Sequence, residues 1–359
     1  MANYYPDQTL IMPLTVIRRE RLLPPDVEGT VTVREGEHVS AVDVVARGVR
    51  ANRYVILDLP RLLGVRDPDA LDDLLHVGEW EIVKAGDILA GDQEKKRNLV
   101  RSPVSGMVAG LREGRLILQT DLSEVEVRAG CNGSVASVRG NRGVLLETVG
   151  ALVQGAWGNG RYHFGLLQAE PKEGLAALEA DEIATQWRGA IVLTQRPLTR
   201  RALDRAVALQ IGGIIAPSMH ADLRKVALRL KMPIMLTEGF GAEQLSPLVT
   251  EVLEAHYGRQ AALHAPEPRH WQPDRPEVIV PLHSDRLPPT PPRDAALRVG
   301  AEVRITRRPY LGLVGQVKDL PATPQVIENG LRLPVAAVTL PSGRTVIVPL
   351  ANLEFFGRG

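Results

Sequence analysis

Short runs of alternating apolar and polar residues, each closed by a glycine, fill the first half of the chain. Three of them begin with Gly, carry Val two residues later, and end with an apolar residue, Arg and a closing Gly: Gly29–Gly36, Gly106–Gly114 and Gly133–Gly140. Alternation of this kind buries one face of a strand, and the closing glycine permits a tight turn. The repeats are too short and too unevenly spaced for a solenoid. We therefore expect residues 1–168 to form a β-rich domain built of hairpins.

The pattern changes in residues 169–264, where short apolar runs alternate with amphipathic segments. Leu198, Ala202, Ala206 and Leu209, for example, lie three or four residues apart and would share one face of a helix. We expect strands at 190–194, 211–216 and 233–237, and helices at 175–186, 198–209, 223–230 and 243–256. Strands that alternate with helices form parallel βαβ units. This segment therefore predicts a central parallel α/β domain.

Prolines dominate the next segment, with nine between Ala265 and Pro292. Proline fixes φ and lacks an N–H, so it cannot continue a helix or a central strand. We interpret residues 265–297 as a proline-rich linker, with the apolar piece Val278–Leu282 docked on a neighbouring domain. Residues 298–359 then form a fourth unit, and the whole chain is expected to be a multidomain α+β protein.

The composition excludes several classes of protein. The chain has 359 residues, a formal net charge of +1 and a single cysteine, Cys131, so an internal disulfide and a cysteine-rich zinc site are both excluded. No segment from Met1 to Leu14 has the order of a secretory signal, and no run of 18 apolar residues occurs. We expect a cytoplasmic protein that does not enter a membrane.

The C-terminal segment carries the most specific pattern. From Val299 to Val317 the sequence is VGAEVRITRRPYLGLVGQV, with Gly312 and Gly315 where backbone segments approach closely or bend sharply. This spacing resembles the signature of KOW modules, which are small SH3-like β-barrels. The resemblance spans about sixty residues, from Arg298 to Gly359, and implies such a barrel here.

KOW modules bind RNA or proteins through the loop after the first strand, and their known settings are transcription and translation. The resemblance places Arg304, Arg307, Arg308 and Tyr310 in that loop. Eight Lys/Arg against four Asp/Glu between residues 298 and 359 give a local charge of +4. Guanidinium groups can bind phosphates and a tyrosine can stack on a base. The alternative is a barrel docked on the protein's own domains, with Tyr310 in its core.

A second resemblance covers about a third of the chain. The segments Val83–Ala90 and Leu99–Val108 resemble biotinyl- and lipoyl-type barrel-sandwich hybrid domains, which carry a Gly-Asp strand, an exposed hairpin and a Pro-x-x-Gly-x-Val strand. In the carrier members a lysine of that hairpin holds the cofactor, which implies Lys95 or Lys96 here. The flanking methionine is absent, so a solvated polar hairpin is the competing interpretation.

Other features of the sequence are weaker. His220 follows Gly212-Gly213 and precedes Pro233, an order that resembles that of phosphohistidine domains. The spacing from His220 to Pro233 differs from theirs, and a histidine at the start of a solvent-exposed helix is the alternative interpretation. The loop Gly155–Gly160 lacks the Lys-Ser/Thr of a P-loop. Glu238 ends the third expected strand, where open α/β sheets bind ligands; a simple turn is the alternative.

Two hypotheses about function follow. The first is a non-catalytic binding or scaffold protein that contacts RNA, DNA or a protein through its KOW-like module, without a cofactor or a metal. The second is a carrier or phosphotransfer component that uses Lys95, Lys96 or His220. The sequence leaves the oligomeric state open.

Overall fold

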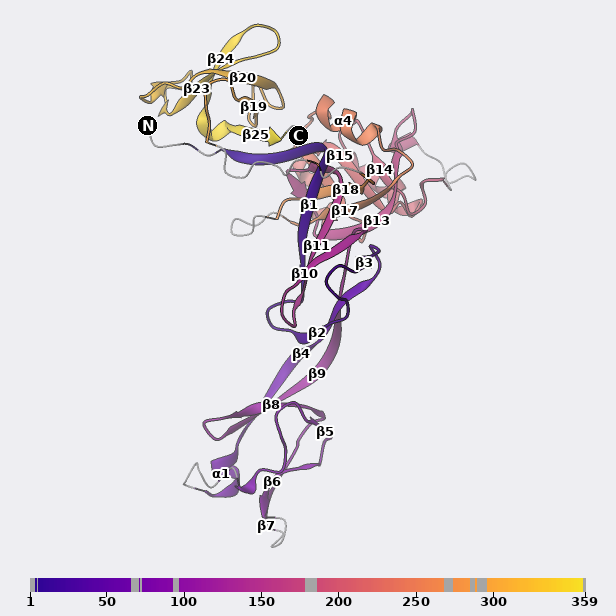
Figure 1. The fold of residues 1–359 in the computed structure, drawn as a ribbon, viewed down its shortest axis with the longest axis vertical. Coiled ribbons are helices and arrows are strands. Elements are labelled where there is room, and N and C mark those ends of the chain that lie inside the picture. The colour runs from indigo at the N-terminus through magenta and orange to yellow at the C-terminus, as the bar shows by residue number, and fades with distance from the viewer. Residues whose placement is uncertain are drawn as a thin grey trace.

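The fold was obtained as a computed structural model, which describes residues 4, 6–65, 71, 73–92, 97–177, 186–267, 274–284, 288 and 296–357. Strands form 49% of the structure and helices 13%, so the protein is β-rich and contains several sheets, as a multidomain α+β chain should. The molecule is elongated, with its long axis running from the β6–β7 hairpin to the C-terminal strands (Figure 1). Lys95 and Lys96 lie outside the described residues.

A long two-stranded ribbon sets this shape. Strand β4 (Val44–Asp58) pairs with β9 (Arg115–Arg128) in antiparallel register from Val44–Arg128 to Asp58–Arg115. At about 3.3 Å per residue, such a ribbon is on the order of 45 Å long. It belongs to a five-stranded sheet with β2 (Glu28–Val31), β8 (Gly106–Arg112) and β5 (Ile82–Val83). The ribbon places the unit around β5–β8 far from the large sheet (Figure 1).

The unit at the far end of the ribbon has its own core. Helix α1 (Leu59–Leu63) and the hairpin of β6 (Ile88–Asp92) and β7 (Arg97–Arg101) enclose buried Leu89, Leu116 and Leu118. The expected Gly-Asp step is the turn before β6. Gly86 has φ +96°, and Asp87 Oδ2 accepts a hydrogen bond from the Lys84 amide at 2.7 Å. Glycine is needed there because its φ is positive.

The second sheet is much larger and has 16 strands. Its α/β part contains parallel strands β13 (Arg161–Ala169), β14 (Ile191–Leu193), β15 (Gly213–Met219) and β16 (Ile234–Phe240), flanked by antiparallel β12 (Trp157–Gly158) and β17 (Gln260–Ala265). The helical segments are η2 (Leu175–Ala177), α2 (Arg200–Ala208), η4 (Ala221–Leu223), α3 (Arg224–Ala227) and α4 (Pro247–Glu254). The strands and the helices α2, α3 and α4 follow the expected order. Of the helix expected at 175–186 the structure describes only the 3₁₀ turn η2 and residue 186, since residues 178–185 lie outside the described part of the chain. The expected boundary at residue 168 falls inside this sheet, because Leu167 pairs with Ile191.

Helix α2 shows how the local sequence dictates this part of the fold. Thr199 caps its N-terminus, with Oγ1 accepting a hydrogen bond from the Ala202 amide at 3.2 Å. Ala202, Leu203 and Ala206 form its buried face. A side-chain acceptor satisfies one of the unpaired N–H groups of the first turn, and the apolar stripe packs on the sheet.

The segment that we interpreted as a linker contains a central strand. Strand β18 (Glu277–Pro281) pairs on one side with β17 and on the other with β11 (Gly143–Gln154). Val278, Ile279 and Val280 are all buried. The proline density pointed to an extended backbone, but a run of three β-branched residues without an interior proline is long enough to form a ladder. Strands β1 (Asp7–Leu22), β10 (Gly133–Val138) and β3 (His38–Val39) complete this region.

The C-terminal strands extend the same sheet. In the order of pairing they are β25 (Leu353–Gly357), β19 (Glu302–Ile305), β20 (Val314–Asp319), β23 (Val335–Thr339) and β24 (Thr345–Pro349). A short hairpin of β21 (Gln325–Val326) and β22 (Arg332–Leu333) and the 3₁₀ turn η5 (Leu350–Asn352) lie beside them. Parallel pairing of β1 with β25, from Asp7–Glu354 to Leu10–Gly357, joins this C-terminal module to the rest. None of the described helices is long and apolar enough to cross a bilayer.

Alanine at Val280 tests whether β18 is a core strand. Val280 is fully buried, so Val280→Ala should lower the free energy of unfolding by about 2 kcal/mol, since two methyl groups lose their packing. Val207→Ala, on the exposed side of α2, should stay within about 0.5 kcal/mol of the wild type. Urea unfolding followed by circular dichroism measures both. If Val280→Ala changed the free energy of unfolding as little as Val207→Ala does, the result would contradict a buried strand at this position.

Candidate functional site

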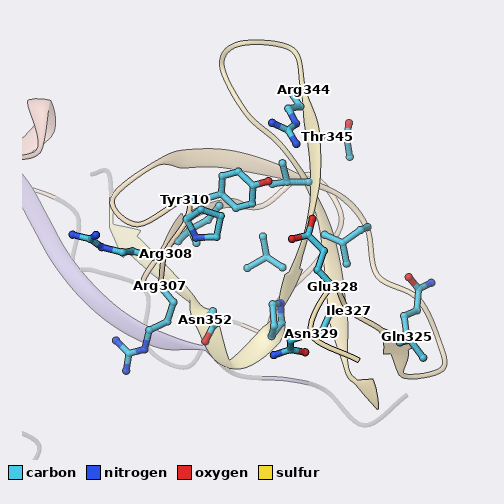
Figure 2. Close-up of a pocket in the computed structure, with 17 residues that line it drawn as sticks. Arg307, Arg308, Tyr310, Gln325, Ile327, Glu328, Asn329, Arg344, Thr345 and Asn352 are labelled. Atoms are coloured by element: carbon cyan, nitrogen blue, oxygen red, sulfur yellow. The ribbon is translucent and has the colours of Figure 1, made fainter. Parts of the chain in front are cut away.

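A groove of about 510 Å³ crosses the C-terminal module (Figure 2). Three segments line it: the stretch from Arg307 to Tyr310, the stretch 325–329 that includes β21, and the stretch 344–349 that includes β24. Figure 2 shows Arg307 and Arg308 at one end and Gln325 at the other, with Arg344 above the ring of Tyr310. The groove therefore brings together three of the four residues expected in the binding loop.

Each of these three side chains has a different setting. Arg307 is exposed, and its Nη1 donates to the Thr306 carbonyl at 3.2 Å. Arg308 is exposed and pairs with Glu243 of the α/β part, donating from Nε at 3.1 Å. Tyr310 is half-buried against the module's core, and the Arg344 guanidinium lies 5.8 Å from its ring centroid. A cation over a tyrosine face is attractive, so Arg344 and Tyr310 position each other.

The remaining lining adds hydrogen-bonding groups and a small apolar surface. Gln325, Asn329 and Asn352, which carry amide side chains, line the groove together with Val326 and Ile347. Val326 and Ile347 are exposed. Glu328 is the one carboxylate among the described residues that line it, against three arginines. The lining therefore has a formal charge of +2, and Arg307 and Arg344 supply positive charge to an anionic ligand while Arg308 is paired with Glu243.

The two glycines singled out in the sequence shape the strand that follows the loop. Gly312 has φ +81°, a conformation that other residues rarely adopt. A Cβ on Gly315 would lie 2.6 Å from the carbonyl oxygen of Thr339 on β23, so only glycine allows β20 to approach β23 this closely. Both positions are structural and set the curvature of the loop that carries Tyr310.

Arg304 is separated from the other three residues. It is buried on β19, its Nε donates to Glu354 Oε1, and its Nη1 lies 3.2 Å from Glu238 Oε1 on β16. Glu354 also accepts a hydrogen bond from Thr9 Oγ1 on β1 at 2.6 Å. We call Arg304, Glu354 and Glu238 the brace, because together they connect the C-terminal module to the α/β part of the sheet.

Burial and mutual interaction shift the pKa values of Arg304 and Glu238 in the brace. Burial by itself lowers the pKa of Arg304, but Glu354 and Glu238 more than offset this and raise it, so the guanidinium stays charged. Burial raises the pKa of Glu238; Arg304 opposes the rise, and the carboxylates of Glu354 and Glu243 add to it. Glu354 has Thr9 and, at 3.8 Å, Arg275 as further partners beside the shared Arg304, so Glu238 is the carboxylate that depends more on Arg304.

Nothing in the sequence pattern indicated that Glu354 belongs to the brace, or that Arg275, whose Nη1 lies 3.8 Å from Glu354 Oε2, lies beside it. In the stretch Glu302–Ile305, Val303 and Ile305 enter the core of the module, and alternation places Arg304 on the opposite face. If only the sequence of the module is considered, an arginine on that face is expected to be exposed to solvent. The parallel pairing of β1 with β25, which covers that face, joins residues almost 350 positions apart and leaves no local signal.

Of the residues predicted as alternative carriers of a cofactor or a phosphate, the structure describes only His220, which does not line the groove. His220 follows β15 at the start of η4 and is exposed, with Nδ1 at 3.0 Å from Asp222 Oδ2. Its role as a phosphate acceptor stays a prediction, as does that of Lys95 and Lys96, which the structure does not describe. Within the described part of the chain, no group of three or more His, Cys, Asp or Glu residues has the arrangement of a metal site.

Comparison of the sequence with protein-family models and with curated proteins finds no match in either case.

Removing the arginine of the brace should destabilise the protein strongly. Arg304→Ala leaves buried Glu238 without its cation and leaves Glu354 with only the longer ion pair to Arg275, at 3.8 Å, so we expect the free energy of unfolding to fall by about 3–5 kcal/mol. Arg307→Ala, only three residues along the chain but exposed, should change it by about 0.5 kcal/mol or less. Urea unfolding distinguishes the two, and similar values would contradict the brace.

The raised pKa of Glu238 predicts a pH dependence. As the pH rises above the ordinary Glu value of about 4.3, the unfolded chain releases this proton before the folded protein does. The wild type should therefore lose stability relative to Glu238→Gln until the pH passes the raised folded pKa, above which the difference is constant. Urea unfolding of both proteins between about pH 4 and pH 8 measures it. A difference that does not change with pH would contradict the assignment.

Proposed function

We propose that this chain is a non-catalytic binding protein that holds a single-stranded nucleic acid in the groove of its C-terminal module. The observation that carries the proposal is that one groove is lined by three arginines, Arg307, Arg308 and Arg344, and by Tyr310, with Arg344 over the tyrosine ring. Arginine binds phosphates through paired N–H donors, and an aromatic ring offers a base a stacking surface. Single strands are bound by this combination because their bases are free to turn toward the protein.

We also propose that the module is an SH3-like barrel of the KOW type. Its strands pair in the order β25-β19-β20-β23-β24. The last strand along the chain, β25, therefore pairs with the first strand of the module, β19, and the 3₁₀ turn η5 directly precedes β25. Five short strands that pair antiparallel within about 60 residues support the small β-barrel that the resemblance implies. Gly312 and Gly315 occupy the positions that the KOW signature reserves for glycine.

The groove favours an extended, flexible ligand over a duplex. It lies between β24 and the stretch 325–329, and five consecutive residues of β24 line it. Amide side chains from Gln325, Asn329 and Asn352 can hydrogen-bond base edges along its length. A free strand edge can also pair with a peptide, so an acidic peptide is the ligand that the experiment must distinguish.

The remainder of the chain acts, in this proposal, as a scaffold. The unit around β5–β8 has the motifs of a barrel-sandwich hybrid domain, and the β4–β9 ribbon carries it to the opposite end of the molecule (Figure 1). A protein that binds nucleic acid at one end and presents a separate folded unit at the other can connect two partners.

Binding of a fluorescent oligouridylate of about 12 nucleotides to the full-length protein tests the proposal. We expect binding at low salt, with a slope of log K against log salt of about −1.5 to −2 for two to three neutralised phosphates. Arg307→Ala/Arg344→Ala should weaken binding about tenfold or more and flatten the slope by about 1.4, since two phosphate contacts are lost. Fluorescence anisotropy at several salt concentrations measures both quantities.

Arg298→Ala is the matched control, because Arg298 is exposed on the same module but outside the groove. Its affinity should lie close to that of the wild type. Absence of binding at low salt would sink the proposal, and so would a double variant that binds as tightly as the control. Displacement of a labelled acidic peptide, without oligonucleotide binding, would assign the groove to a protein partner instead.

A further inference from the structure

A second cavity, of about 210 Å³, lies where the C-terminal module meets the large sheet. Its wall comes from segments far apart in the chain, on β1, β16, β19 and β25 and in the stretch before β18. The polar side chains that define it are Thr9, Thr237, Glu238, Arg275, Arg304 and Glu354. Arg307 lines this cavity as well as the groove, so one guanidinium stands between the two spaces.

The two carboxylates of this cavity are already engaged by the protein. Glu354 accepts from Arg304 Nε and from Thr9 Oγ1, and Arg304 Nη1 lies 3.2 and 3.3 Å from the two oxygens of Glu238. Both side chains are almost fully buried, with exposed fractions of 4–5%. Their acceptor capacity is directed at the brace, which leaves the cavity lined mainly by donors.

Donors and positive charge are in excess. Arg275, Arg304 and Arg307 carry three positive charges against the two negative charges of Glu238 and Glu354, a net of +1. Arg275 Nη1 donates to Thr9 Oγ1 at 2.7 Å and lies 3.8 Å from Glu354 Oε2, and these two contacts hold its guanidinium at the cavity wall. The hydroxyl of Thr237 is buried at the same wall and has no hydrogen-bond partner among the described residues. Buried polar groups are rarely left unpaired, so this one marks a place for a ligand or its water.

The size and position of the cavity fit a small anion. A volume of 210 Å³ is far above the roughly 10–15 Å³ that a cavity needs to hold one water, so a tetrahedral oxyanion with part of its hydration shell fits. Thr237 and Glu238 lie in the second half of β16, toward the carboxyl ends of the parallel strands β15 and β16. Ligands of open α/β sheets bind at that edge.

We propose that this cavity is a binding site for a phosphate group, held by Arg275 and Arg307 with Arg304 behind them. Planar guanidinium groups match the oxygens of a phosphate, and the brace fixes one of them before the ligand arrives. The phosphate is either a free ion or the terminal phosphate of a strand in the adjacent groove. The second source rests on the proposed function. Burial raises the pKa of Glu238, which lessens the repulsion between this carboxyl and an anion.

Titration of the full-length protein with inorganic phosphate tests the site itself. Isothermal calorimetry at constant ionic strength, with chloride as the reference anion, should show saturable binding of phosphate. Arg275→Met should weaken it about tenfold or more, because a charged hydrogen bond is lost. Arg259→Met, at an exposed position that does not line the cavity, is the matched control and should bind phosphate as the wild type does.

Thr237→Val provides a second variant that should fold without difficulty, since the hydroxyl it removes has no partner among the described residues. Its melting temperature in chloride should equal or exceed that of the wild type, while the stabilisation by phosphate should shrink. No saturable binding by the wild type would overturn the proposal. Unchanged phosphate binding in both Arg275→Met and Thr237→Val would overturn it as well.

Three oligouridylates show whether the bound phosphate is a free ion or the end of a nucleic-acid strand. One carries a 5′-phosphate, one a 3′-phosphate, and one hydroxyls at both ends. A tighter complex with one phosphorylated end, lost in Arg275→Met, supports recognition of a strand terminus. Binding of inorganic phosphate without any effect of the end groups supports a free ion. If phosphate binds and no oligonucleotide does, the site stands and the proposed function fails. If all three bind equally and phosphate does not, the proposed function stands and the site fails.

Discussion

The connection between the C-terminal module and the large sheet depends on one buried guanidinium. Arg304 holds Glu354 of its own module and Glu238 of β16, while Thr9 of β1 holds the other oxygen of Glu354. These charges are desolvated, so each is tolerated only while its partner is present. The groove and the second cavity both border Arg307, three residues further along the chain. The geometry of both therefore depends on the brace keeping the module in place.

This arrangement explains why an arginine cluster in the sequence divides into two roles. Arg304 enters a strand and faces the rest of the protein, whereas Arg307 and Arg308 follow the strand and remain exposed. Arg308 still touches the α/β part through Glu243. The module is therefore not a freely tethered accessory, since a strand pairing, a buried ion network and an exposed ion pair all connect it to the sheet.

Local patterns in the sequence predicted the elements well, and long-range pairing escaped them. The capped, amphipathic helix α2 and the buried runs of β14, β15 and β16 follow from spacing alone. For the candidate site, the sequence identified Arg307, Arg308 and Tyr310, but Arg344 and the amides of 325–329 reach the groove only through folding of the hairpins. The sequence did not predict that β18 lies between β17 and β11, because the prolines around it favoured a linker. Register between distant strands is set by the whole core, and no short motif encodes it.

Hydrogen–deuterium exchange of the full-length protein, with and without a saturating oligouridylate, tests most directly that the groove is where the protein binds its ligand. Ligand contacts slow the exchange of the amides they cover. We expect protection to be concentrated in 305–310, 325–329 and 344–349, the three segments that line the groove. Protection centred on the β4–β9 ribbon or on the α/β helices, with these three segments unchanged, would contradict it.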